Sequence, residues 1–232
     1  MKPEALVEWV TKEFERRRNP EKAIAMAAYM QNRFPFWGIQ APEQGQIAKH
    51  IFPHLKPFVD QAWLEQAALL LYEQDQREYH YFAVNLLSKF GKQLTIAAMP
   101  TVEQLVVTHS WWDTVDAIAS RIVGDLVLRF PELAATMDTY STYDNLWLRR
   151  VAILHQLNYK QETDVERLFR YCATNAESKE FFIRKAIGWA LREYAKTDSE
   201  AVIEFVRDNR DRLSNLSKRE ALKRTSVDWR EI

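Results

Sequence analysis

The sequence predicts an all-α fold, a HEAT-like helical-repeat solenoid with a concave face. Apolar residues recur at spacings of three and four residues along nearly the whole chain, which is the period of helices that bury one side. The 232 residues include only five glycines and almost no stretches of alternating apolar and polar residues, which argues against β-sheet.

Prolines fall between the periodic segments and predict where short helices begin and end. The prolines that separate segments in this way are Pro20, Pro35, Pro42, Pro53, Pro57, Pro100 and Pro131. No Ser/Gly-rich linker or low-complexity stretch divides the chain, so we expect a single domain over residues 1–232.

Composition limits the classes of function. Hydrophobic residues make up 47% of the chain, which is ample for a core. Thirty-two Lys and Arg balance thirty-two Asp and Glu, so the whole-molecule charge gives no evidence for a polyanionic partner. Any nucleic-acid site must therefore be a local basic face. The basic stretch "LSNLSKREALKRT" is explained equally well by a solvated helix end.

The sequence contains no signal for a membrane or a metal. No apolar run is long enough to cross a bilayer, and the opening "MKPEALVEWVTKEFERRR" has no signal-peptide core, so we expect a cytoplasmic protein. The single cysteine, Cys172, and five scattered histidines show no zinc-binding spacing. We expect neither a metal nor an organic cofactor.

A helix type recurs along the chain. "LWLRRVAIL" from Leu146 and "FFIRKAIGW" from Phe181 share an order of apolar and basic residues, with a period of about 35 residues. "WWDTVDAIA" from Trp111 and "YHYFAVNLL" from Tyr79 fall roughly one further period upstream each. Such spacing is typical of paired-helix repeats that stack and form a concave surface.

The segment "SWWDTVDAI" presents two helix faces, because residues four apart in a helix lie on the same side. One face is an apolar stripe that we expect to be core, formed by Trp111, Val115, Ile118 and Ile122. Trp112 and Asp116 lie on another face. Taken alone, this pair favours a structural interpretation, with Trp112 as a partly buried rim aromatic and Asp116 as a solvated or cap-pairing carboxylate.

The same rotation in the later repeats selects basic and aromatic residues: Arg150, Lys185, Trp189 and Arg192. A groove with cationic and aromatic groups around one carboxylate suits a phosphodeoxyribose backbone, since cations hold phosphates and flat rings pack on sugars and bases. For single residues the alternatives stay open: Arg150 pairs with an acid at a repeat junction, or Trp189 belongs to the core.

Several long motifs resemble the DNA alkylation repair family, the HEAT-like-repeat alkylpurine DNA glycosylases. The motifs are "SWWDTVD", "NLWLRRVAILHQLNYK" and "SKEFFIRKAIGWALREYAKTD". The resemblance extends to "NPEKAIAMAAYMQNRFPFWGIQAPE" near the start and "LSKREALK" near the end, so it covers nearly the whole chain.

The resemblance implies roles for named residues. Trp112, Asp116, Arg150 and Trp189 match the residues that cradle the damaged nucleotide, with Asp116 as the catalytic carboxylate. Tyr29, in "AAYM", matches a DNA-facing position. The mild departures, Val151 and the additional Arg149, remove no key side chain.

The implied activity is excision of 3-methyladenine and 7-methylguanine from double-stranded DNA by a monofunctional glycosylase. An N3- or N7-alkylated purine is positively charged and leaves as a neutral base, so one carboxylate that stabilises oxocarbenium-like charge is enough. Asp113 is the rival for this role, although Asp116 shares a face with Trp112. No lysine is clearly placed as a Schiff-base nucleophile, so we expect an abasic product without strand cleavage.

Two other functions remain open from the sequence. Helical solenoids often serve as non-catalytic scaffolds for DNA or protein, and fold alone does not fix function. A family member specialised for bulky adducts is the second. A groove for duplex DNA favours a monomer, which would associate with the nucleoid when acting on DNA.

Overall fold

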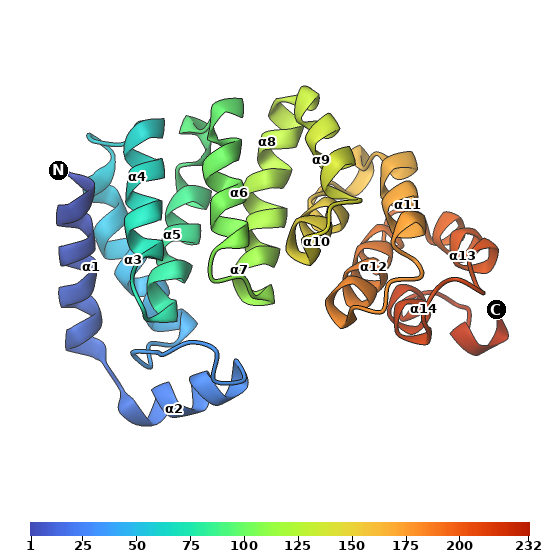
Figure 1. The fold of residues 1–232 in the computed structure, drawn as a ribbon, viewed down its shortest axis with the longest axis horizontal. Coiled ribbons are helices and arrows are strands. Elements are labelled where there is room, and N and C mark those ends of the chain that lie inside the picture. The colour runs from blue at the N-terminus through green and yellow to red at the C-terminus, as the bar shows by residue number, and fades with distance from the viewer. The chain divides into compact units, whose positions relative to one another are not determined.

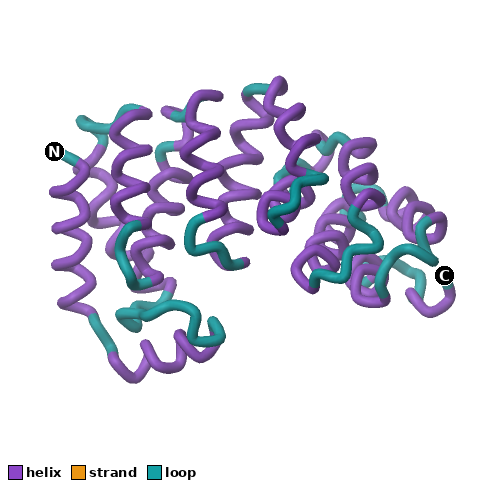
Figure 2. The backbone as a smooth tube through the Cα atoms, viewed as in Figure 1, coloured by secondary structure: helices purple, strands orange, loops and turns teal.

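The computed structural model describes residues 1–232, and every element in it is helical, without any β-strand (Figure 2). The predicted all-α fold is therefore confirmed. The helices pack into two compact units, residues 1–109 and 110–232. The single domain over 1–232 stays a prediction. None of the helices is both long and apolar enough to span a bilayer.

The first unit is organised around α4, which packs against both α1 and α5, while α3 packs against α5 (Figure 1). Its helices are α1 (Pro3–Arg17), α2 (Pro20–Tyr29), α3 (Ala41–Leu55), α4 (Gln61–Tyr72), α5 (Arg77–Lys89) and α6 (Met99–Val107), with 3₁₀ turns at Gly91–Gln93 and Ile96–Ala98. Helix α2 buries none of its residues, so it is the most exposed helix of this unit.

In the second unit, α10 packs against α7 and α12, and α12 packs closely against α14 (Figure 1). Its α-helices are α7 (Trp112–Ala117), α8 (Gly124–Arg129), α9 (Ala134–Tyr140), α10 (Leu146–Leu154), α11 (Val165–Thr174), α12 (Phe181–Tyr194), α13 (Ser199–Asp208) and α14 (Asn215–Leu222). A π-helical segment (Ile118–Val123) joins α7 to α8, and 3₁₀ turns span Pro131–Leu133, Lys160–Glu162 and Trp229–Glu231.

Of the prolines expected to separate helices, all but one lie at a helix start or outside the helices. Pro20, Pro42 and Pro100 stand in the first turns of α2, α3 and α6, where a missing N–H costs nothing. Pro53 was expected between helices but lies inside α3. It is two residues from the end of the helix, so only a bond to the carbonyl of Lys49 is lost there.

The predicted core stripe on the "SWWDTVDAI" helix is buried. The exposed fractions of its members are 6% for Trp111, 0% for Val115 and Ile118, and 2% for Ile122. The helix continues without interruption from α7 through the π-helical segment to α8. This π-helical segment begins two residues after Asp116, and such segments are often found at functional sites.

A buried carboxylate holds the loop within the "FPFWGIQAP" motif. Glu78, on α5, accepts hydrogen bonds from the backbone N–H groups of Trp37, Gly38 and Ile39 at 3.0, 2.9 and 3.0 Å. Burial raises the pKa of Glu78, and the backbone hydrogen bonds oppose the rise. Gly38 has a φ of +87°, and a Cβ there would lie 2.0 Å from the carbonyl oxygen of Asn19. This part of the long N-terminal motif therefore has a structural role, because Glu78 and the close approach at Gly38 hold the loop in place.

Replacing Gly38 with alanine should destabilise the protein by about 1–3 kcal/mol, because the left-handed backbone and the clash must both be accommodated. Gly45→Ala is the control, since a Cβ at this position in α3 meets nothing within 4 Å. It should stabilise the helix by about 0.5–1 kcal/mol. Urea denaturation followed by circular dichroism measures both. Equal effects of the two substitutions would contradict this description of the loop.

Candidate active site

A cavity of about 380 Å³ in the second unit brings together six of the seven predicted site residues. The cavity is lined by Trp112, Asp116, Arg150, Phe181, Phe182, Lys185, Trp189 and Arg192. The seventh predicted residue, Tyr29, belongs to the first unit and is 71% exposed at the end of α2. There it lines a separate, largely apolar cavity of about 290 Å³.

Three of these residues occupy the same position in three different helices. Asp116, Arg150 and Lys185 each stand four residues after the first residue of α7, α10 and α12. Because α10 packs against both α7 and α12, these positions converge on one cavity. The repeat in the sequence thus determines which side chains meet.

The centre of the cavity is a bidentate ion pair between Asp116 and Arg150. Arg150 Nε donates to Oδ1 of Asp116 at 2.6 Å, and Nη2 donates to Oδ2 at 2.8 Å. The two side chains are 13% and 3% exposed. The third guanidinium nitrogen, Nη1, donates to the backbone carbonyl of Phe182 on α12. A bidentate, charge-assisted pair of this kind fixes the orientation of both planar groups.

From the sequence, Arg150 could contact DNA or pair with an acid at a repeat junction, and the geometry shows the ion pair. The side chain pairs with an acid at the junction between helices of adjacent repeats, and three of its five N–H groups are already engaged. Two N–H groups remain for a ligand in the cavity. Arg150 therefore holds the Asp116 carboxylate in place, in addition to any contact with DNA.

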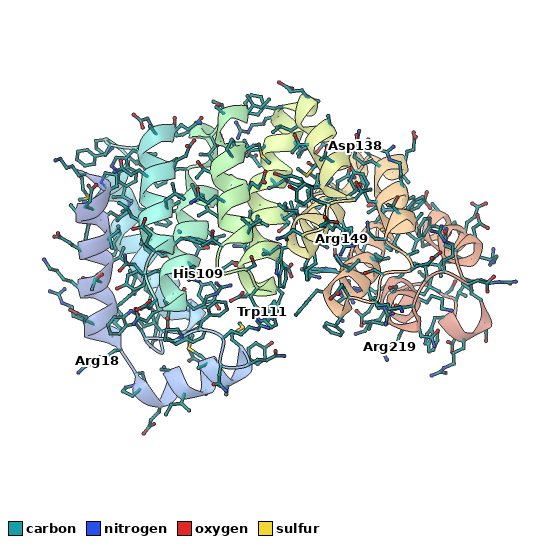
Figure 3. The ribbon with its side chains drawn as sticks, viewed as in Figure 1. Arg18, His109, Trp111, Asp138, Arg149 and Arg219 are labelled. Carbon is teal, nitrogen blue, oxygen red and sulfur yellow. The ribbon has the colours of Figure 1, made fainter.

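An aromatic cluster that was not assigned from the sequence supports this ion pair. The ring of Phe182 lies 4.9 Å from that of Trp111 and 5.0 Å from that of Trp147, measured between centroids. The two tryptophans are buried, and Trp111 stands immediately before α7 (Figure 3). Packing of Phe182 fixes the carbonyl that accepts from Arg150. The sequence repeat could have indicated this cluster, since Phe182 and Trp147 occupy equivalent positions in it.

The environment of Asp116 changes its acidity. Burial raises the pKa of this carboxyl group, while the hydrogen bonds and charge of Arg150 oppose the rise and nearby Asp113 adds to it. Asp113 itself does not line the cavity, and its Oδ1 accepts from the N–H of Thr114 at 3.0 Å. The geometry thus favours Asp116 over Asp113 as the carboxylate that faces a ligand.

Aromatic side chains form part of the lining of the cavity. Trp112 and Trp189 are half-buried, with part of each ring system accessible to a ligand. Trp189 is therefore not a fully buried core residue. Phe181, which the sequence did not single out as a site residue, is 59% exposed at the start of α12. Flat rings in these positions can pack on a sugar, a base or both.

Two cations lie on α12 at the cavity. Lys185 and Arg192 are half-buried, and both pair with the carboxylate of Glu220 on α14. The Lys185 Nζ lies 3.0 Å from Glu220 Oε1, and Arg192 Nη1 donates to Glu220 Oε2. Glu220 was known from the sequence only as the single acid in a basic stretch. No group of three or more His, Cys, Asp or Glu side chains is arranged to hold a metal ion.

Comparison with known proteins identifies the family of the chain. The family model described as "DNA alkylation repair enzyme" matches residues 10–225. The solved structure of a predicted DNA alkylation repair enzyme from Enterococcus faecalis is 32% identical to this chain. It superposes with a TM-score of 0.84, over 91% of this chain and 98% of that chain. A search of curated proteins found no match.

The chain belongs to the DNA alkylation repair enzyme family, because the family model covers most of its length. The expected helical-repeat fold is confirmed by the match to the solved structure. Membership supports a role in the repair of alkylation damage and DNA as the partner.

Substituting Arg150 with glutamine should destabilise the protein by on the order of 3–5 kcal/mol, because it leaves a largely buried carboxylate without its counter-charge. Chemical denaturation measures the loss. Arg149→Gln is the matched control one residue earlier on α10 (Figure 3), where the guanidinium Nε is buried without a hydrogen-bond partner. It should destabilise the protein much less than Arg150→Gln, because no buried carboxylate loses its counter-charge. Similar losses for both arginines would contradict the special role of the Asp116 pair.

Proposed function

We propose that the protein is a monofunctional DNA glycosylase that hydrolyses the N-glycosidic bond of N3- and N7-alkylated purines in duplex DNA. The observation that carries the proposal is the carboxylate of Asp116, which is 13% exposed and lies in a cavity walled by aromatic and cationic side chains. Family membership indicates alkylated DNA as the substrate, and the residues of the cavity indicate the type of reaction.

One carboxylate suits this leaving group. Glycoside hydrolysis usually takes two carboxyl groups, one of which protonates the departing oxygen. An alkylated purine already carries a positive charge and departs as a neutral base, so the acid is not needed. Asp116 would then stabilise the positive charge that develops on the deoxyribose and orient the attacking water. Arg150 holds the carboxylate in a fixed orientation for that role.

The aromatic walls suit a cationic lesion. A cation over the face of tryptophan gains roughly 1–2 kcal/mol when the contact is desolvated. Trp112 and Trp189 both expose ring surface to the cavity of Asp116. They would therefore favour the alkylated nucleotide over its neutral counterpart, which is the discrimination that repair requires.

The cations of the cavity suit the DNA backbone. Lys185 and Arg192 would contact phosphates next to the damaged nucleotide, with Tyr29 as a further backbone contact. A Schiff-base lyase needs a lysine with a neutral amine. Lys185 instead forms an ion pair with Glu220, so we expect an abasic product with an intact strand. The reaction as proposed uses neither a metal nor a cofactor.

The direct test is release of free 7-methylguanine and 3-methyladenine from methylated duplex DNA in the presence of EDTA. We expect release by the wild type and a loss of about 10²–10³-fold in single-turnover rate for Asp116→Asn, the size typical of removing one preorganised electrostatic group. Asp113→Asn is the matched control and should retain the activity. Full activity of Asp116→Asn at unchanged DNA binding would refute the assignment.

The pH dependence of release gives a second test. The ionised form of Asp116 is the active one, so activity falls as the pH drops through its pKa. Since burial raises this pKa, the acidic limb should have its midpoint above that of an ordinary aspartate, about 3.9. Single-turnover release from a 7-methylguanine duplex, corrected for spontaneous loss, measures the profile. A limb at or below the ordinary value would contradict the assigned environment.

Excision of larger adducts is the second candidate. A cavity of about 380 Å³ has room for much more than a methyl group. Profiling release from duplexes that carry methylated or bulky N7-adducts distinguishes the two specificities. Binding of all duplexes without release of any base would identify a non-catalytic DNA-binding protein instead.

A further inference from the structure

Glu220 is the one acidic side chain that contacts both cations of the active-site cavity. It comes from α14, its side chain is 9% exposed, and its two oxygens pair with Lys185 and Arg192. The two cations stand seven residues apart, two turns of α12, so both reach the same carboxylate. Asp116 meanwhile is paired with Arg150 and leaves these cations to Glu220.

The packing of α14 on α12 fixes the position of Glu220. A Cβ added at Gly188 would lie 2.5 Å from the Cβ of Glu220 and 2.9 Å from the carbonyl oxygen of Ser217, so the two helices touch at this glycine. The Ser217 hydroxyl donates to the carbonyl of Arg184 at 2.9 Å and ties the helices together one turn earlier. These contacts hold the backbone of Glu220 against α12.

Glu220 remains charged at neutral pH. Burial favours its neutral form, but the hydrogen bonds and charges of Lys185 and Arg192 outweigh burial and lower the pKa of the carboxyl group. Two cations and one carboxylate leave this side of the cavity with a net charge of +1 instead of +2. The neighbouring Arg219 on α14 is exposed to solvent (Figure 3), so the neutralisation is local to the cavity.

We propose that Glu220 attenuates the charge of Lys185 and Arg192 and so limits the affinity of the cavity for undamaged DNA. This inference rests on the proposed function. Undamaged phosphates attract any cation, whereas only a cationic lesion gains from the tryptophan faces and from Asp116. Lowering the phosphate contribution therefore increases the share of the binding free energy that depends on damage.

The cations stay available for a phosphate in this arrangement. An ammonium has three N–H donors and a guanidinium has five, and Glu220 engages one of each here. Both side chains also remain partly exposed, 38% for Lys185 and 21% for Arg192. DNA can therefore bind without breaking the ion pairs, and the attenuation acts in the complex as well as in the free protein.

The test compares Glu220→Gln with a charge-matched control. Glu193→Gln removes the same charge from α12, but Glu193 pairs with Lys196 and lines a different cavity. Ser217→Ala loosens the contact between α12 and α14 without a change of charge. Fluorescence anisotropy measures the binding of each variant to an undamaged duplex and to a duplex with 7-methylguanine. The salt concentration is varied from about 50 to about 200 mM, because the affinity that comes from phosphate contacts falls steeply over this range.

We expect Glu220→Gln to bind undamaged duplex about tenfold more tightly. The plot of log affinity against log salt concentration should be steeper by roughly 0.9, which corresponds to about one additional phosphate contact. Its preference for the damaged duplex should fall correspondingly. Glu193→Gln should stay close to the wild type, and Ser217→Ala should not steepen the salt dependence.

Unchanged or weaker binding by Glu220→Gln, or an equal gain by Glu193→Gln, would overturn the inference. A gain shared by Ser217→Ala would also overturn it, because helix packing would then be the cause. Base release by the wild type is measured separately. Its absence would refute the proposed glycosylase while the binding comparison still decides the role of Glu220.

Discussion

The ion pair between Asp116 and Arg150 is the interaction on which the cavity depends. A carboxylate that is 13% exposed and beside two tryptophans would be unfavourable in its charged form without a partner. Arg150 supplies that partner with two parallel hydrogen bonds, and the carbonyl of Phe182 holds the third guanidinium nitrogen. The pair thus links α7, α10 and α12, the three helices that form the cavity.

This arrangement shows how a helical repeat can bring charged side chains from several helices to one cavity. Stacked helices place equivalent positions in a row. In this row Asp116 provides a carboxylate, Arg150 a guanidinium and Lys185 an ammonium group. The first two pair with each other, and the third pairs with Glu220 from outside the row. Each charged group at the cavity is therefore oriented before a ligand arrives, which is the condition under which electrostatic stabilisation of a transition state is strongest.

The sequence was sufficient to predict the helical class, the buried stripe and six of the eight side chains that line the cavity. Helical periodicity fixes which face a residue occupies, and the repeat of about 35 residues carries that face from one helix to the next. Trp111 and Val115 are buried for this reason, while Trp112 and Asp116 line the cavity.

The periodicity could not predict which side chains pair between neighbouring helices. It assigns a face but not the distance to a neighbouring helix, so it left the pairing of Arg150 open and gave no partner for Glu220. The seating of α14 depends on the close approach at Gly188, which requires the packed structure. Pro53 shows a different limit, because a proline in the last turn of a helix costs too little to end it earlier.

In the proposed reaction, Asp116 stabilises positive charge on the deoxyribose. The most direct measurement is the affinity for duplexes that carry, at one position, either a cationic pyrrolidine analogue of the sugar or its neutral tetrahydrofuran counterpart. We predict that the wild type prefers the cationic analogue and that Asp116→Asn loses this preference while it binds the neutral analogue as before. An equal preference in both proteins would contradict this role of Asp116.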